Sequence, residues 1–199
     1  GRMRYRSMTS CLMPLANAHG KHIVTIEGVN MEHLNPVQQA MSDEGATQCG
    51  FCTPGFVMSL AGFCLREDVK DYESEALAAI DGNICRCTGY KSIQRAVAKI
   101  AGICSQRKNE EAIVFVSDKK ILPEYFATIK EKLALVQLSC TGHSIVADPE
   151  FFVSGGTDLY VQRHEDLPHS QLSFLLKNEE LSGITGENGV CTIGAASTV

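Results

Sequence analysis

The 199-residue sequence lacks three features that mark other classes of protein. Its longest apolar run, residues 57–65, is about half of the roughly 20 residues that a membrane-spanning helix needs. It has no excess of basic charge, since the formal net charge is −5, and this argues against nucleic acid as the main partner. Its first residues show no secretory leader. We therefore expect a cytoplasmic protein with no membrane span.

The sequence also lacks the pattern of a secreted disulfide scaffold, although it contains nine cysteines. Such scaffolds are short, carry an even number of cysteines and follow a leader. In a reducing compartment thiols stay free, and clustered cysteines there are more often metal ligands or redox groups. Four of the nine are clustered, Cys49 with Cys52 and Cys85 with Cys87.

Residues 29–104 predict a small helical bundle. Asn-Pro at residues 35–36 and Thr-Pro at residues 53–54 each place a capping residue before a proline, which is typical of a helix start. Apolar residues then recur at helical spacing. Four short helices with brief connections indicate a bundle. The expected helices cover about residues 36–44, 53–63, 74–80 and 92–100.

The flanking segments differ in character, so the predicted fold class is α+β and multi-domain. The alternating run at residues 21–28 predicts a strand closed by a glycine turn. Residues 105–112 are charged and aperiodic, as in a linker, and a helix is expected from residue 123 to about 135. Short β-rich pieces follow, at residues 151–153, 172–175 and 190–193. The expected divisions are 1–28, 29–104, 105–135 as the linker, and 136–199.

The two cysteine pairs lie on turns next to helices, so folding of the bundle can bring four sulfurs together. A [2Fe–2S] core needs four thiolates, two for each iron. Gly50, Thr88 and Gly89 are small and let backbone N–H groups approach inorganic sulfide. Arg86 adds a positive charge beside a centre that becomes more negative on reduction. The sequence therefore predicts an iron–sulfur centre.

A structural zinc site is the main alternative. Structural zinc pairs usually have two to four residues between their cysteines, whereas only Arg86 separates Cys85 from Cys87. This spacing argues against zinc without excluding it. The alternative function is thus a zinc-stabilised helical interaction module without a redox role. A thioredoxin-type redox pair would need a β–α–β setting, and the surroundings here are helical.

Residues 48–55 and 82–90 resemble the second [2Fe–2S] domain of the molybdenum hydroxylases, the xanthine dehydrogenase and aldehyde oxidase family. The resemblance implies a helical [2Fe–2S]-binding domain whose cluster lies nearest the molybdenum cofactor. It also implies that Gln48 and Cys87 lie next to the molybdopterin, which is held by a partner chain. The cluster ligands that it implies are Cys49, Cys52, Cys85 and Cys87.

The start of the chain resembles the C-terminal edge of the plant-type ferredoxin domain of this family, at residues 5–12 and 25–28. Cys11 then matches the last ligand of a first [2Fe–2S] cluster. The other three ligands would lie upstream of the 199 residues, and one thiolate cannot hold a cluster. We therefore expect a fragment of a longer protein, and the alternative is a strand cysteine at this position.

Residues 151–159 form a strand that runs into a Gly-Gly turn, whose N–H groups can face an anion such as pyrophosphate. Taken alone, an ordinary hairpin turn is at least as good an interpretation. The turn also resembles the first flavin loop of the FAD domain that follows the iron–sulfur bundle in this family. The loop residues are Val153, Ser154, Gly155, Gly156, Thr157, Asp158 and Leu159.

Joined iron–sulfur and FAD segments resemble the small subunit of xanthine dehydrogenases. This resemblance implies an oxidoreductase subunit that passes electrons from a molybdenum site through [2Fe–2S] clusters to FAD. Substrate oxidation would occur on the partner, a molybdenum-cofactor-binding large subunit, within a dimer of heterodimers.

Four further cysteines lack ligand spacing, and we expect each to be a small buried apolar residue. They are Cys64, Cys104, Cys140 and Cys191.

Overall fold

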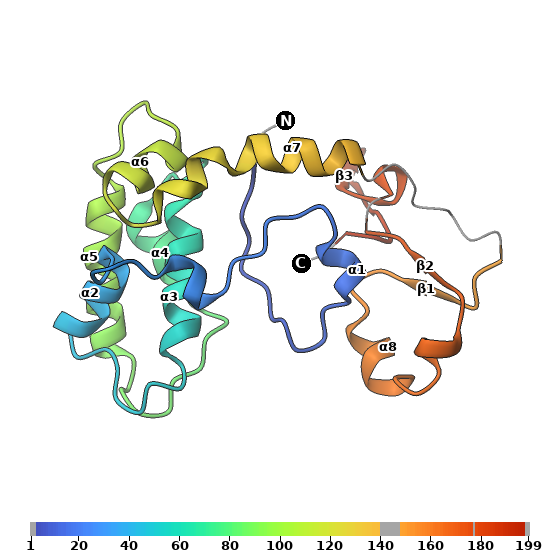
Figure 1. Cartoon of the computed structure of the whole chain (residues 1–199), viewed down its shortest axis with the longest axis horizontal. Helices are drawn as coiled ribbons and strands as arrows, with labels where there is room; N and C mark the ends of the chain where they lie inside the picture. Colours follow the sequence, from blue (N-terminus) through green and yellow to red (C-terminus); the bar gives the residue numbers. More distant parts are fainter. Residues whose placement is uncertain (1–2, 140–147, 177, 198–199) are drawn as a thin grey trace. The chain divides into compact units, whose positions relative to one another are not determined.

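The computed structural model describes residues 3–139, 148–176 and 178–197. The chain divides into two compact units (Figure 1). The first combines Gly1–Ser7 with Ile23–Ala134, and the second combines Met8–His22 with Leu135–Val199. The described chain is mostly helical, with two small two-stranded sheets.

Four helices form the core of the first unit, as the sequence predicts. They are α2 (Pro36–Asp43), α3 (Thr53–Cys64), α4 (Tyr72–Ala79) and α5 (Lys91–Cys104). Helix α5 contacts each of the other three (Figure 1). Fully buried side chains from α3 and α5, such as Phe56, Leu60, Ile93 and Ile100, fill the space between these two helices.

The start of α2 shows why the sequence predicts it well. The Asn35 side-chain oxygen accepts hydrogen bonds from the N–H groups of Val37 and Gln38, at 3.0 and 2.9 Å. The Gln38 side chain accepts the N–H of Asn35 in return, at 3.0 Å. These reciprocal bonds satisfy donors that a helix start leaves unpaired. Helix α4 begins two residues before the predicted position, because Asp71 caps it in a similar way.

Much of the expected linker, residues 105–135, belongs to the core of the first unit. It contains α6 (Ala112–Asp118), the 3₁₀ helix η2 (Glu124–Thr128) and the start of α7 (Ile129–Ser139). The linker prediction rests on the charged segment that begins at residue 105, but the apolar residues that follow this segment pack against the bundle. Buried apolar residues of this part of the chain include Phe115, Val116, Ile121, Leu122 and Phe126.

The strand predicted at residues 21–28 is wrong. This segment has no strand and ends in the 3₁₀ helix η1 (Ile26–Val29). A strand needs a neighbour to pair its backbone groups. Here Val24 and Ile26 pack against the helical core instead, and the Tyr125 hydroxyl donates to the Gly28 carbonyl at 3.0 Å.

The second unit contains the three predicted strands and one more. Strand β1 (Phe151–Val153) pairs in parallel with β2 (Leu172–Phe174), and Phe151 lies opposite Leu172. Strands β3 (Ile184–Glu187) and β4 (Val190–Ile193) form an antiparallel hairpin. The strand that the sequence did not predict is β3, and one of its four residues is Gly186. The other elements are α1 (Leu15–Ala18), α8 (Thr157–Gln162), η3 (Leu167–His169) and η4 (Glu179–Leu181).

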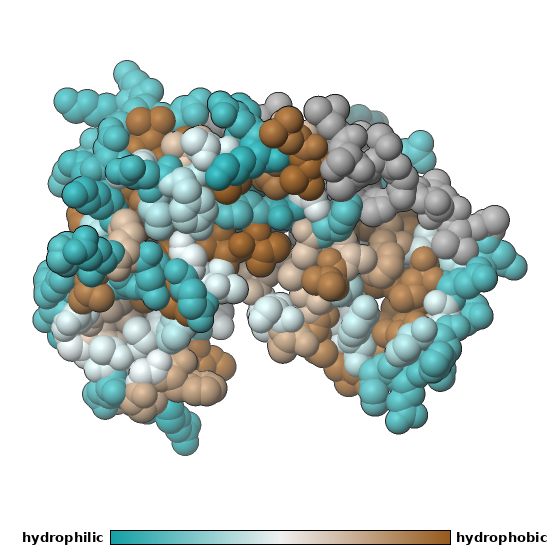
Figure 2. Space-filling view, in the orientation of Figure 1, coloured by the Kyte–Doolittle hydropathy of each residue, from teal (hydrophilic) through white to brown (hydrophobic). Residues whose placement is uncertain are grey.

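The visible surface of the first unit is largely hydrophilic, with apolar residues in scattered patches (Figure 2). Within the described residues, no helix combines the length and apolar character that crossing a membrane would require.

Candidate metal centre

The cysteines lie on the two connections that link the bundle's helices in pairs. Residues 49–52 connect α2 to α3, and residues 85–87 connect α4 to α5. Gly50 has a φ of 84°, a left-handed conformation that glycine adopts without a Cβ clash. Cys52 directly precedes α3, so the start of that helix fixes its backbone. Both connections thus end in rigid helices.

The two turns bring the four cysteines together in pairs. The Sγ atoms of Cys49 and Cys87 are 3.5 Å apart. The thiols of Cys52 and Cys85 interact as a second pair. Each pair takes one cysteine from each turn, so the centre depends on the packing of both turns and not on either motif alone.

The donor set suits a two-iron core. In the part of the chain that the structure describes, no three His, Cys, Asp or Glu side chains gather closely enough to coordinate one ion. The Cys49 and Cys87 sulfurs are in contact. A [2Fe–2S] core takes four thiolates, two on each iron. The four cysteines of the two turns supply that number and kind of ligand.

Thr88 supports the thiolate form of Cys85. Its hydroxyl oxygen lies 3.1 Å from the Cys85 Sγ, and its N–H donates to the same sulfur at 3.5 Å. The Thr88 hydroxyl, followed by the N–H groups of Thr88 and Cys87, lowers the pKa of Cys85 to about 7. Since the thiolate is the metal-binding form of cysteine, these contacts prepare Cys85 as a ligand.

The other three thiols divide in the same way. The Phe51 N–H, and then the Cys87 thiol, lowers the pKa of Cys49. The Cys87 thiol donates a hydrogen bond to the Cys49 sulfur, and this raises the pKa of Cys87. Burial raises the pKa of Cys52. Each pair thus holds one cysteine that favours the thiolate and one that keeps its proton. Metal binding would displace the remaining protons.

A polar contact behind the cysteines fastens the second turn to α3. The Asn83 side-chain amide donates to the Ser59 hydroxyl at 2.8 Å and to the Ile80 carbonyl at 3.3 Å. A Cβ added at Gly55 would lie 2.6 Å from the Asn83 side-chain oxygen, so glycine leaves room for Asn83. Gly55, in the first turn of α3, is the one feature of the sequence that indicates a close neighbour there.

Tyr90 holds the second turn from its other side. Its hydroxyl accepts the Cys85 N–H at 2.9 Å. Its own backbone is left-handed, with a φ of 67°, which is uncommon for a residue with a side chain. No local pattern in the sequence marks Tyr90 for this role.

An ion-pair cluster fixes the first turn. The Glu44 carboxylate, at the end of α2, contacts Lys99 Nζ at 2.6 Å and Arg95 Nε at 2.8 Å, both on α5. Arg95 also donates to the Glu44 carbonyl at 3.2 Å. Lys99, followed by Arg95, lowers the pKa of Glu44. The cluster ties α2 to α5 just before the turn that carries Cys49.

The other candidate residues are more dispersed. Gln48 and Arg86 are exposed beside the two turns. Cys11 is exposed in a turn of the second unit. Cys191 is exposed rather than buried as expected, and Cys140 lies outside the described residues.

The Gly-Gly turn of the second unit is not a hairpin. It connects β1 to α8, and α8 leads to the parallel strand β2. Gly156 has a φ of 80°, and a Cβ there would lie 2.6 Å from Pro14. The buried Asn17 side chain donates to the Ser154 carbonyl at 3.0 Å. The ordinary hairpin interpretation of residues 153–159 is therefore wrong.

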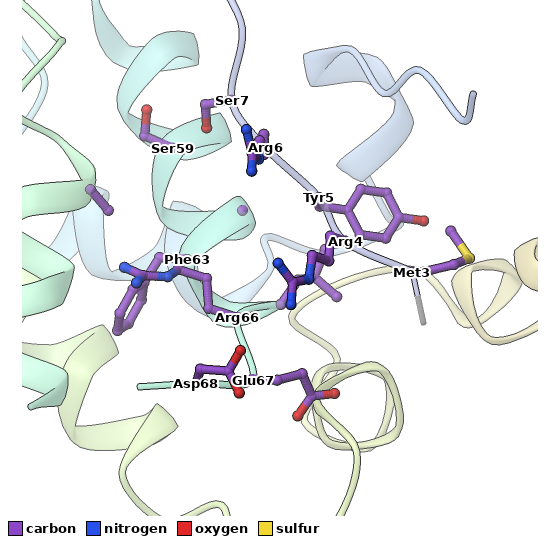
Figure 3. Close-up of a pocket in the computed structure, with 13 residues that line it drawn as sticks. Met3, Arg4, Tyr5, Arg6, Ser7, Ser59, Phe63, Arg66, Glu67 and Asp68 are labelled. Carbon is purple, nitrogen blue, oxygen red and sulfur yellow. The ribbon is translucent and has the colours of Figure 1, made fainter. Parts of the chain in front are cut away.

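A cavity of about 450 Å³ lies elsewhere in the first unit, between residues 3–7 and the C-terminal end of α3 (Figure 3). Its lining includes Arg4, Arg66 and Asp68. The first cysteine turn adjoins the opposite end of α3, and none of the four cysteines of the metal centre lines the cavity.

Comparison with known proteins bears on the helical unit. Residues 25–98 match the family model described as a [2Fe-2S] binding domain. The chain therefore contains a [2Fe–2S]-binding domain. The chain is 42% identical over 114 residues to aldehyde oxidase 1 of Cavia porcellus, covering 55% of this chain and 8% of that protein. It is 44% identical over 93 residues to xanthine dehydrogenase of Emericella nidulans, covering 46% of this chain and 7% of that protein.

Human aldehyde oxidase is 37% identical over 113 residues, covering 54% of this chain and 8% of that protein. The [2Fe–2S]-binding domain is thus related to xanthine dehydrogenases and aldehyde oxidases, which suggests electron transfer. The chain spans less than a tenth of the length of these relatives.

Proposed function

We propose that this chain is an electron-transfer subunit of a molybdenum hydroxylase of the xanthine dehydrogenase type. It would relay electrons from a molybdenum site on a partner chain, through [2Fe–2S] clusters, to FAD. The observation that carries this proposal is the pairing of Cys49 with Cys87 and of Cys52 with Cys85 inside the matched domain.

The four cysteines would hold a [2Fe–2S] core, which supplies one-electron transfer when bound. Cys85 is buried and Cys52 is half-buried, whereas Cys49 and Cys87 are exposed. The protein therefore shields one side of the centre from water and leaves the other side at its surface. A short path to an external redox group is the arrangement that electron relay needs.

The surface beside the exposed pair suits a protein partner. Phe51 is 93% exposed and Ile84 is 82% exposed, and they lie on the two cysteine turns. Large apolar side chains exposed beside a functional centre mark an interaction surface. Gln48 is exposed at the same turn. We assign this surface to the molybdenum-cofactor-binding large subunit, with Gln48 near the molybdopterin, in a cytoplasmic dimer of heterodimers.

The second unit would contribute to the flavin side of the path. The strand, Gly-Gly turn and helix at residues 151–162 are a common setting for phosphate groups, and the open space around Gly155 leaves room for one. We propose that residues 153–159 contact FAD. Cys11 would be one ligand of a further [2Fe–2S] cluster.

Iron and sulfide analysis of anaerobically purified protein tests the metal assignment. We expect about two irons and about two sulfides per chain from the four-cysteine site, and a visible absorption that dithionite bleaches. Cys85→Ala should lose the iron, the sulfide and the visible absorption. The matched variant Cys191→Ala, at an exposed cysteine of β4, should keep all three. Colourless protein with one zinc per chain would instead indicate the zinc-stabilised module.

A further inference from the structure

A second cysteine pair lies inside the first unit, away from the metal centre. Cys64 is the last residue of α3, and Cys104 is the last residue of α5. Their Sγ atoms are 3.3 Å apart, and the residues are only 3% and 4% exposed. From the sequence we expect two unrelated buried residues, since 40 positions separate them. Their burial is confirmed, and the fold adds their contact.

The distance between the two sulfurs is short enough for bond formation. A disulfide has an S–S length of about 2.05 Å, so the sulfurs need to approach by roughly 1.3 Å. Two packed helices already hold them in contact.

A buried cation lies near both thiols. The Arg107 side chain is only 6% exposed and contacts the Glu67 carboxylate at 3.8 Å. Its positive charge favours the thiolate form of Cys64 and of Cys104. The thiolate is the form of cysteine that reacts with oxidants.

We propose that Cys64 and Cys104 form a reversible disulfide that joins the C-terminal ends of α3 and α5. The oxidant is hydrogen peroxide. The thiolate of one cysteine attacks one peroxide oxygen, the O–O bond breaks, and a sulfenic acid forms as hydroxide leaves. The thiolate of the other cysteine then attacks that sulfur, the S–O bond breaks, and a second hydroxide leaves. In total, two thiols and one hydrogen peroxide give one disulfide and two waters.

The disulfide would stabilise the helices that carry the metal centre. Helix α3 directly follows the first cysteine turn, and α5 directly follows the second. The bond would close a loop of about 40 residues and so restrict the unfolded chain. We expect the melting temperature of the first unit to rise by on the order of 10 °C, and a dithiol to reverse the rise. The pair needs no metal, so its test is independent of the proposed function.

Peptide mapping of the peroxide-treated full chain tests the proposal. Cleavage at Phe63 separates Cys64 from the cysteines of the first turn, and cleavage at Lys99 and Arg107 isolates Cys104. We expect a peptide with Cys64 linked to a peptide with Cys104, in the wild type and in Cys191→Ala. The linked peptide and the reversible thermal shift should both be absent in Cys64→Ala and in Cys104→Ala.

The wild-type chain gives the decisive result even if a core variant fails to fold. Alkylation after unfolding in denaturant reports which thiols were still free. Free Cys64 and Cys104, under peroxide treatment that oxidises the exposed Cys191, would overturn the proposal. A linked peptide without a dithiol-reversible rise in melting temperature would overturn its stabilising role.

Discussion

The side-chain amide of Asn83 donates a 2.8 Å hydrogen bond to the hydroxyl of Ser59. Ser59 is buried on α3, and Asn83 lies on the turn that precedes Cys85. This bond fixes the position of one cysteine turn on the helix that follows the other. The metal centre therefore depends on a polar contact outside its own ligands.

Loss of this contact should destabilise the first unit. Asn83→Ala leaves the buried Ser59 hydroxyl without this donor, which costs about 1–3 kcal/mol of unfolding free energy. Urea denaturation of the two proteins measures the difference. Asp81→Ala, at an exposed position of the same turn, is the control and should stay within about 0.5 kcal/mol of the wild type. Equal effects of the two variants would contradict the role of Asn83.

Two glycine-to-alanine variants should change stability in opposite directions. Gly55→Ala places a Cβ 2.6 Å from the Asn83 side-chain oxygen and should destabilise the protein. Gly102→Ala, on α5, meets no atom within 4 Å and should stabilise it by about 0.4–1 kcal/mol, because alanine restricts the unfolded chain. Thermal unfolding of both variants tests this. A stabilising Gly55→Ala would show that Asn83 does not approach α3 as described.

Removal of the Thr88 hydroxyl should make the iron–sulfur centre harder to reduce. Hydrogen bonds to a ligand sulfur stabilise the more negative, reduced state. Thr88→Val removes the contact 3.1 Å from the Cys85 sulfur, so the reduction potential should shift to more negative values. Thr88→Ser keeps a hydroxyl and should shift the reduction potential less. A redox titration with mediator dyes measures the potential of both variants. A potential unchanged in Thr88→Val would argue against this hydrogen bond.

The ion-pair cluster at Glu44 should give a pH-dependent contribution to stability. Lys99 and Arg95 lower the pKa of Glu44 in the folded chain, so the contribution is present above the unfolded pKa, near 4.3, and is lost as the pH falls through the lower folded value. Glu44→Gln should therefore reduce the melting temperature at pH 7, and the difference from the wild type should shrink below about pH 4.

Glu110→Gln provides the control for Glu44→Gln. Glu110 is exposed in the loop before α6. Its substitution should have little effect at either pH. A Glu44→Gln difference that persists unchanged at pH 3 would show that lost packing, and not lost charge, causes the destabilisation.

The sequence predicted those elements whose signals are local. Asn35 with Pro36 marked the start of α2, because the capping bonds form within four residues. The alternating residues before Gly28 were misleading, since a strand also depends on a partner. Likewise, the charged residues before 112 resembled a linker, although Phe115 and Phe126 beyond them pack on the bundle. These outcomes depend on contacts between distant segments.

The candidate site also combines features that the local sequence predicts with features that depend on contacts between distant residues. The four cysteines were apparent from their spacing, since both pairs lie on short turns. The pairing of Cys49 with Cys87, and the contact between Cys64 and Cys104, join residues about 40 positions apart. No local pattern encodes such contacts. They follow from the packing of the helices of the bundle against one another.

The central claim is that Cys49, Cys52, Cys85 and Cys87 jointly hold a two-iron core. Electron paramagnetic resonance of the dithionite-reduced protein, with spin counting against iron content, tests it most directly. We predict one unpaired electron per roughly two irons bound at this site, with the signal lost in Cys49→Ala and retained in Cys191→Ala. A signal that survives Cys49→Ala, or reduced protein with zinc and no signal, would contradict the account.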